Sequence, residues 1–177
     1  PLIAQQQPED PPGAGAVVSA PLPPGQELLL PNGLRMVLLE RHRQPVISVA
    51  LSVPAGSAFD PAGREGTADL LASLLTRGAG RRDAEAVTEA VESVGGSLSA
   101  VADPDQLTLQ VDVVARHAPL AFELLADALL RPALDSAELG AQRERTASSL
   151  AEGLADVGTI AARVFLIAAY RSSPYAR

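Results

Sequence analysis

The chain has 177 residues, a formal net charge of −7 and no cysteine. The acidic balance disfavours nucleic-acid binding, because phosphates are neutralised by a basic stripe that this sequence lacks, and the absence of cysteine excludes disulfides and cysteine-based metal or redox chemistry. Hydrophobic residues make up 47% of the sequence, yet no run approaches the ~20 apolar residues of a membrane span, so we predict a globular domain and no membrane span.

The first 25 residues differ in composition from the rest, being rich in Pro, Gly, Gln and Ala. Proline lacks a backbone donor and fixes φ, so we predict that residues 1–25 form an extended arm without regular structure. The segment Pro1–Gln7 fits the tail of a signal peptide cleaved after Ala4, which predicts a periplasmic or extracytoplasmic location. An inter-domain linker, and with it a cytoplasmic location, is the alternative.

Strand signals follow the arm. The Asn32-Gly33 pair between apolar runs favours a type I′ turn, because both residues tolerate positive φ. Residues Val46–Val53 are typical of a buried strand, and Leu107–Val113 alternate apolar with polar residues, which indicates a strand with one wet face.

Helix signals occupy most of the remaining sequence. We expect helices over Thr67–Thr76, over Ala118–Leu130, from Asp135 or Ser136 to Asp156, and over Thr159–Tyr170. A further helix begins after Asp83 as N-cap, with Val87, Val91 and Val94 on one face. The preceding pair Arg81-Arg82 is expected to be a solvated turn.

The segment Arg64–Gly80 carries a spaced frame of small and apolar residues. With the segments Leu30–Leu38, Val94–Ala100 and Ser173–Tyr175, in this order, it resembles the M16 metallopeptidases, the pitrilysin and mitochondrial-processing-peptidase family. The resemblance covers most of residues 28–177. The frame consists of Gly66, Ala68, Leu70, Leu71, Leu74, Leu75 and Gly78.

That resemblance implies a helix that carries an inverted zinc motif, His-x-x-Glu-His, but the two histidines and the glutamate of the motif are missing here. Asp69 and Ser73 stand at the two histidine positions and Ala72 at the position of the general base. Two histidines four residues apart share a helix face and can both bind one Zn²⁺, whereas a carboxylate with a hydroxyl suits a hydrated hard cation at best. The plain alternative is that Asp69 and Ser73 are solvated polar residues.

The third zinc ligand of the family is a glutamate on a long downstream helix. Counting back from Ile160–Arg163 places Ser149 at that position, with an error of one or two residues, and neither Glu144 nor Glu152 falls at the right offset. The sequence therefore predicts no catalytic residue, no metal ligand and no cofactor in this chain, and zinc is expected in a partner.

The resemblance also implies a fold and a role. The fold is an α+β, LuxS/MPP-like metallohydrolase sandwich, with helices on one face of a mixed sheet. Residues 26–177 would form the N-terminal domain, truncated to the first half-domain of a longer chain. We expect a chain that is not catalytic by itself and pairs with a homologous active subunit or domain to enclose an extended peptide substrate. A purely structural scaffold, like the core proteins of a respiratory complex, is the main alternative, and a degenerate enzyme with a relocated metal site is a third.

Overall fold

The computed structural model describes residues 25–176. The extended arm predicted for residues 1–25 lies, except for its last residue, outside the described part. The chain divides into two compact units, with the boundary between Gln44 and Pro45, and each unit is described by itself.

The first unit contains a β-hairpin made of β1 (Gln26–Leu29) and β2 (Arg35–Leu38). Its turn is not the predicted type I′, because Asn32 does not adopt the positive φ that this turn requires at both central residues. The Gly33 amide donates to the Leu30 carbonyl at 2.9 Å and only Gly33, at φ +84°, is left-handed. Pro31 explains the difference: its fixed negative φ suits the first central position of a type I turn, which moves the glycine one place further along.

The second unit is built on a three-stranded antiparallel sheet. Its order is β3 (Val46–Val53), β7 (Leu107–Val114) and β6 (Ser97–Ala102). The predicted bounds of β3 are confirmed, and β7 runs one residue beyond its prediction. The described strand pairs are all antiparallel, so the mixed pairing expected from the sequence is not seen among them.

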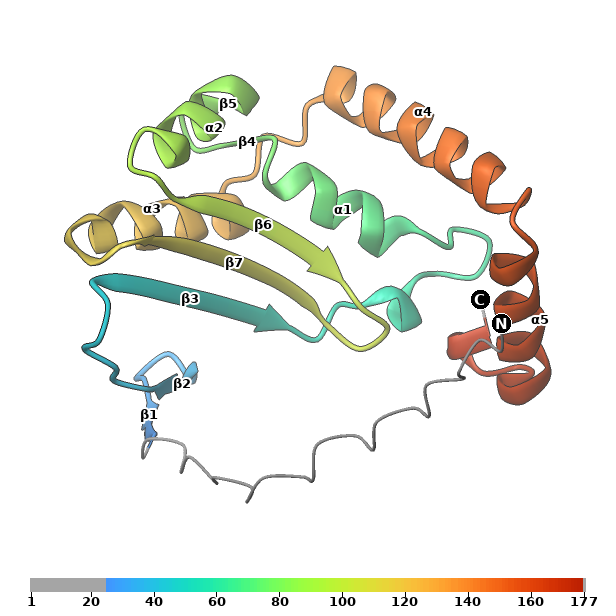
Figure 1. Ribbon diagram of the computed structural model, residues 1–177, viewed down its shortest axis with the longest axis horizontal. Coiled ribbons are helices and arrows are strands. Elements are labelled where there is room, and N and C mark those ends of the chain that lie inside the picture. Colours follow the sequence, from blue (N-terminus) through green and yellow to red (C-terminus); the bar gives the residue numbers. More distant parts are fainter. Residues whose placement is uncertain (1–24, 177) are drawn as a thin grey trace, which may run out of the picture. The chain divides into compact units, whose positions relative to one another are not determined.

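The two faces of this sheet differ, as the alternation in β7 predicts. Residues Leu107, Leu109, Val111 and Val113 are at most 1% exposed, while Gln110 between them faces solvent. The buried face is covered by three helices, α1 (Thr67–Leu75), α2 (Ala84–Glu92) and α3 (Ala118–Leu130) (Figure 1). The expectation of helices packed on one face of a sheet is therefore confirmed, and the bounds of α3 agree with the prediction.

Two further helices follow α3, and their junction differs from the prediction. Helix α4 (Ser136–Gly153) begins after its N-cap Asp135 as expected, but it ends before Asp156. Asp156 instead caps α5 (Val157–Tyr170), because its carboxylate accepts a hydrogen bond from the Thr159 amide at 2.7 Å. The remaining short elements are η1 (Ser57–Phe59), β4 (Gly78–Ala79), β5 (Arg82–Asp83), η2 (Ala115–His117) and η3 (Pro174–Ala176).

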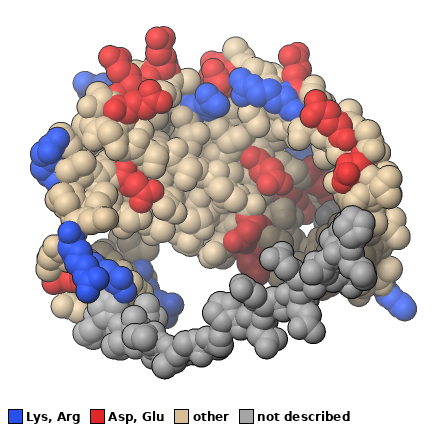
Figure 2. Space-filling model, in the orientation of Figure 1, with Lys and Arg blue, Asp and Glu red and all other residues tan. Residues whose placement is uncertain are grey.

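Charged side chains on the face shown in Figure 2 lie in small groups of both signs, separated by uncharged surface. Within the described residues, no individual helix has the length and apolar content to cross a bilayer. Only α4 and α5 taken together reach that length and composition, and the pair is bent by 95°.

Candidate functional site

Helix α1 is held at its start by a carboxylate from outside the helix. Both oxygens of Asp60 accept hydrogen bonds from free amides of the first turn, Oδ2 from Gly66 at 2.7 Å and Oδ1 from Ala68 at 2.9 Å. Asp60 is buried, and Gly66 is left-handed with φ +91°. A carboxylate at this place satisfies two orphan amides and faces the positive end of the helix dipole, so the start of α1 is firmly fixed.

The frame residues of α1 fix its orientation on the sheet. Ala68, Leu74 and Leu75 are buried, and Leu75 joins the same apolar core as the buried residues of β7. Gly78, just after the helix, has φ +124°, a conformation that favours glycine. The frame recognised in the sequence is therefore made of packing and backbone-conformation residues.

The three degenerate motif positions on α1 lie in different environments. Asp69 is exposed in the first turn, and partial burial, with a smaller contribution from nearby Asp60, raises the pKa of its carboxyl group. Ser73 is half-buried and its hydroxyl donates to the Leu70 carbonyl at 2.7 Å. Ala72 is 2% exposed and belongs to the apolar core. This set offers one carboxylate, one hydroxyl already engaged with the backbone, and a methyl group in place of a base, which does not fit Zn²⁺.

Ser149, the predicted third position, lies on α4, a helix that contacts α1. It is exposed and lines a shallow groove along one side of α4 together with Glu144 and Glu152. Within residues 25–176, no group of three or more His, Asp or Glu side chains is arranged to hold a metal ion. Glu144 and Glu152 thus lie on the same side of α4 as Ser149, but these residues do not form a set of metal ligands.

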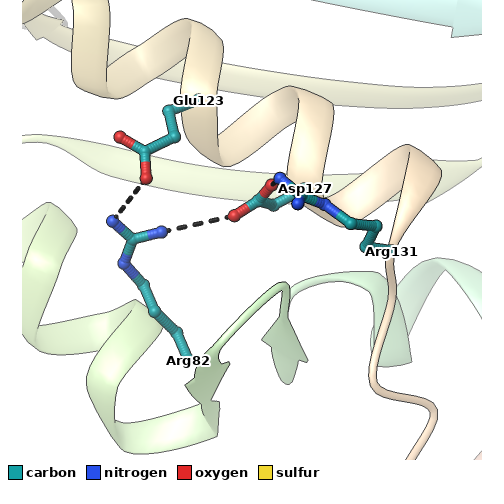
Figure 3. A network of polar contacts seen from close by, with 4 residues as sticks. All are labelled: Arg82, Glu123, Asp127 and Arg131. Carbon is teal, nitrogen blue, oxygen red and sulfur yellow. Dashed lines mark hydrogen bonds and ion pairs between the residues drawn. The ribbon is translucent and has the colours of Figure 1, made fainter.

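A cluster of four charged residues beside α3 was missed in the sequence (Figure 3). Arg82 bridges two carboxylates, with Nη2 2.8 Å from Glu123 Oε1 and Nη1 3.4 Å from Asp127 Oδ2. Arg131, one turn after Asp127 on the chain, donates to its other oxygen. The Arg82 side chain is only 26% exposed and pairs with both carboxylates, so the expectation that it is a solvated turn residue was wrong.

This cluster ties the segment between α1 and α2 to α3. A Cβ atom at Gly80 would lie 2.3 Å from Asp127 Oδ2, and the Gly80 amide donates to the Arg131 carbonyl at 2.9 Å. The close approach, together with the left-handed φ of +63° at Gly80, favours glycine at this position. The available sequence signal was a lone acid on the apolar side of a helix with an arginine four residues later, a spacing at which side chains meet.

The segment Ser173–Tyr175 lies against the turn between β6 and β7. The Tyr175 hydroxyl donates to Asp105 Oδ1, and this hydrogen bond raises the pKa of the phenol. The loop before η1 packs on the same turn, with the Ser57 amide donating to the Asp103 carbonyl at 3.0 Å. A Cβ atom at Gly56 would lie 2.2 Å from that carbonyl oxygen, so only glycine fits there. The segment Ser173–Tyr175 therefore holds the turn between β6 and β7 through the Tyr175 hydroxyl.

Helices on one face of a sheet, with α1 in contact with strand β6, define an α+β domain. The chain belongs to the insulinase family, peptidase family M16, whose family model matches residues 35–177. Two solved structures share the fold. One is a peptidase M16 inactive domain from Pseudomonas fluorescens, with a TM-score of 0.81 and 20% identity over 86% of this chain and 37% of that chain. The other is a protease from Helicobacter pylori, with a TM-score of 0.80 and 22% identity over 88% of this chain and 38% of that chain.

Similar proteins include subunits of larger assemblies. The probable mitochondrial-processing peptidase subunit beta of Arabidopsis thaliana is 30% identical over 115 residues, which are 65% of this chain and 22% of that protein. Subunit 1 of the human cytochrome b-c1 complex is 26% identical over 156 residues, which are 88% of this chain and 32% of that protein. The chain therefore spans between about a fifth and a third of the length of these relatives.

Proposed function

We propose that this chain is a non-catalytic M16 subunit or half, which pairs with a zinc-bearing homologue to form a chamber that degrades or processes peptides. The observation that carries this proposal is the state of α1. Its frame residues Ala68, Leu74 and Leu75 are buried, while Asp69, Ala72 and Ser73 provide neither the imidazoles nor the base that zinc hydrolysis uses. The preserved fold with altered chemistry favours a role in assembly and substrate holding.

An extended peptide is the substrate class that this geometry favours. Strand β6 contacts α1 and lies at an edge of the described sheet, with β7 as its only described neighbour. The outer backbone groups of an edge strand can pair with an added strand, which gives affinity through main-chain hydrogen bonds. Ser97 and Ser99 of β6 are exposed and small, so the side chains on the wet face leave room beside this edge.

The first test measures metal and activity in the purified chain. We expect no stoichiometric zinc by elemental analysis and no chelator-sensitive cleavage of unstructured peptides. One tightly held zinc per chain that is lost in Asp69→Ala would contradict the proposal. Glu89→Ala, which removes an exposed carboxylate from a different helix, α2, serves as the control.

The second test concerns pairing. A homologue that carries an intact His-x-x-Glu-His motif is mixed with this chain, and the mixture is assayed for co-elution and for peptide cleavage. We expect the mixture to cleave peptides that neither protein cleaves alone. If the homologue is fully active by itself and the two do not co-elute at micromolar concentration, the paired-protease proposal fails.

A purely structural subunit is the second candidate, and one observation favours it. The match to subunit 1 of the human cytochrome b-c1 complex covers 88% of this chain, more than the 65% covered by the processing-peptidase beta subunit. The neighbouring coding region distinguishes the two candidate functions. An adjacent homologue with the intact zinc motif supports the paired protease, and stable co-purification without peptide cleavage supports the scaffold.

A further inference from the structure

Helix α3 carries apolar side chains on the side that faces away from the sheet. Of its exposed residues only one is charged. These residues are Pro119, Phe122, Glu123, Ala126 and Leu130. The two largest apolar side chains, Phe122 and Leu130, are 52% and 74% exposed. A helix on the surface of a domain normally carries polar residues on its outer side, so these apolar side chains mark a contact surface.

Three of these residues, Phe122, Ala126 and Leu130, form a ridge along α3. They are four residues apart, and residues at this spacing lie one above the other on a helix. Ridges of this spacing pack into the matching grooves of a second helix at a crossing angle of about 50°. Ala126 is in the middle of the ridge, where its small side chain lets a second helix approach to about 8 Å between the helix axes. The ridge therefore fits another helix that has a ridge of the same kind.

Two exposed charges of opposite sign lie on one flank of this ridge. Glu123 and Arg131 are eight residues apart, and their side chains are 53% and 69% exposed. Within the chain each already has one partner, Arg82 for Glu123 and Asp127 for Arg131 (Figure 3). A guanidinium group has five N–H donors and a carboxylate has several acceptor sites, so both side chains can also contact a second molecule.

The positions of these residues make the surface self-complementary. Ala126 is midway between Phe122 and Leu130 in the sequence, and the midpoint of the two charged residues is the next position. A two-fold axis beside Ala126 therefore places Phe122 of one copy against Leu130 of the other. The same axis places Glu123 beside Arg131 of the other copy when the two helices are antiparallel. In a parallel pair the charged flanks lie on opposite sides, so the antiparallel pair alone gains these ion pairs.

We propose that the ridge of Phe122, Ala126 and Leu130 is a site of self-association, at which α3 pairs antiparallel with α3 of a second copy of this chain. A ridge of three side chains covers less than the ~800 Å² per partner that a standard interface buries, so the association is weak and depends on concentration. This proposal needs no zinc-bearing homologue and stands or falls separately from the proposed function.

Single-cysteine cross-linking tests this proposal, because the 177-residue chain contains no cysteine. Ala126→Cys places a thiol where the two helices cross, which is close enough for a disulfide between the copies. Glu89→Cys places a control thiol on the exposed side of α2. Both chains are oxidised with diamide at the same micromolar concentration, and the covalent dimer is followed by non-reducing electrophoresis. We expect Ala126→Cys to form it roughly tenfold faster than Glu89→Cys, because the contact raises the effective concentration of its thiols.

Second substitutions in the Ala126→Cys chain test which surface makes the contact. Leu130→Gln shortens the ridge and should remove most of the rate advantage. Val157→Gln changes a residue of α5 that is 79% exposed and should leave the rate unchanged. Glu123→Gln removes the acid that faces Arg131 of the second copy and should lower the rate by about threefold. The three substituted side chains are exposed, so none of these variants disturbs the core.

Equal rates for Ala126→Cys and Glu89→Cys overturn the proposal, as does a rate that Leu130→Gln leaves unchanged. A loss in Val157→Gln as large as that in Leu130→Gln assigns the association to α5, which also overturns it. An unchanged rate in Glu123→Gln overturns the antiparallel arrangement, because only that arrangement places this acid in the contact.

Discussion

Asp127 is the residue whose removal tests the packing of this domain most directly. In Asp127→Ala the carboxylate that joins Arg82 and Arg131 is lost, and both arginines lose a charged hydrogen-bond partner. Breaking a buried ion pair typically costs 3–5 kcal/mol, because the remaining charge is left unpaired. Here the cost is smaller, since Arg82 keeps Glu123 at 2.8 Å and the Arg131 side chain is 69% exposed.

We therefore expect Asp127→Ala to lower the free energy of unfolding by about 2 kcal/mol, which corresponds to roughly 5 °C in Tm for a domain of this size. The free energy of unfolding is measured by urea titration, with one m-value fitted to all variants. The matched pair Asp127→Asn and Glu123→Gln removes one negative charge from Arg82 in each case, and the two carboxylates differ in distance and in burial.

The comparison of these two variants sets distance against burial, and Asp127→Asn also weakens the contact with Arg131, which Glu123→Gln leaves intact. Glu123 lies closer to Arg82, at 2.8 Å against 3.4 Å, but its side chain is 53% exposed, whereas that of Asp127 is 5% exposed. Solvent screens the exposed pair, so Asp127→Asn should cost more than Glu123→Gln by about 1 kcal/mol. Equal costs, or a larger cost for Glu123→Gln, would refute the reasoning that burial controls the strength of this cluster.

Three further predictions concern single positions. Gly56→Ala should lower stability by at least about 2 kcal/mol in chemical denaturation, because its Cβ would lie 2.2 Å from the Asp103 carbonyl oxygen, while Gly140→Ala, with nothing within 4 Å, should be neutral or stabilising. Asp83→Ala should cost about 1 kcal/mol by the same measurement, since it removes the N-cap acceptor of α2. Burial, aided by a nearby carboxylate, raises the pKa of Asp69, so the native state holds this proton more tightly than the unfolded chain and stability falls as the pH rises through the raised pKa. Asp69→Asn should therefore be more stable than the parent at pH 7 by thermal unfolding, with a gap that closes as the pH falls to the ordinary aspartate pKa; a constant gap would contradict this.

Local patterns sufficed for much of the fold. The bounds of β3 and α3 followed from apolar periodicity and from a terminating Arg-Pro, signals that depend on neighbours in the sequence. The Asn32-Gly33 pair alone predicts the wrong turn type, because Pro31 takes the first central position of the turn and Gly33 then follows the two central residues. Asp60 and Asp127 were missed for a different reason. Asp60 bonds to a helix start six to eight residues away, beyond the adjacent positions that capping rules consider, and Asp127 pairs with Arg82 on another element as well as with Arg131 four residues later.

The frame of α1 could be recognised in the sequence because most of the residues that pack this helix are not the ones at the zinc-motif positions. The frame residues Ala68 and Leu75 are both buried, so a larger or smaller side chain at either position would disturb the packing of α1. Asp69 and Ser149, which the resemblance places at two of the ligand positions, face solvent, where most substitutions change stability by less than about 0.5 kcal/mol. Under the proposed function, substitutions at these two positions would change the stability of the fold little. Ala72 is the exception: it is 2% exposed in the apolar core, so a glutamate placed there would have to enter that core, and the missing base is the hardest part of the motif to restore.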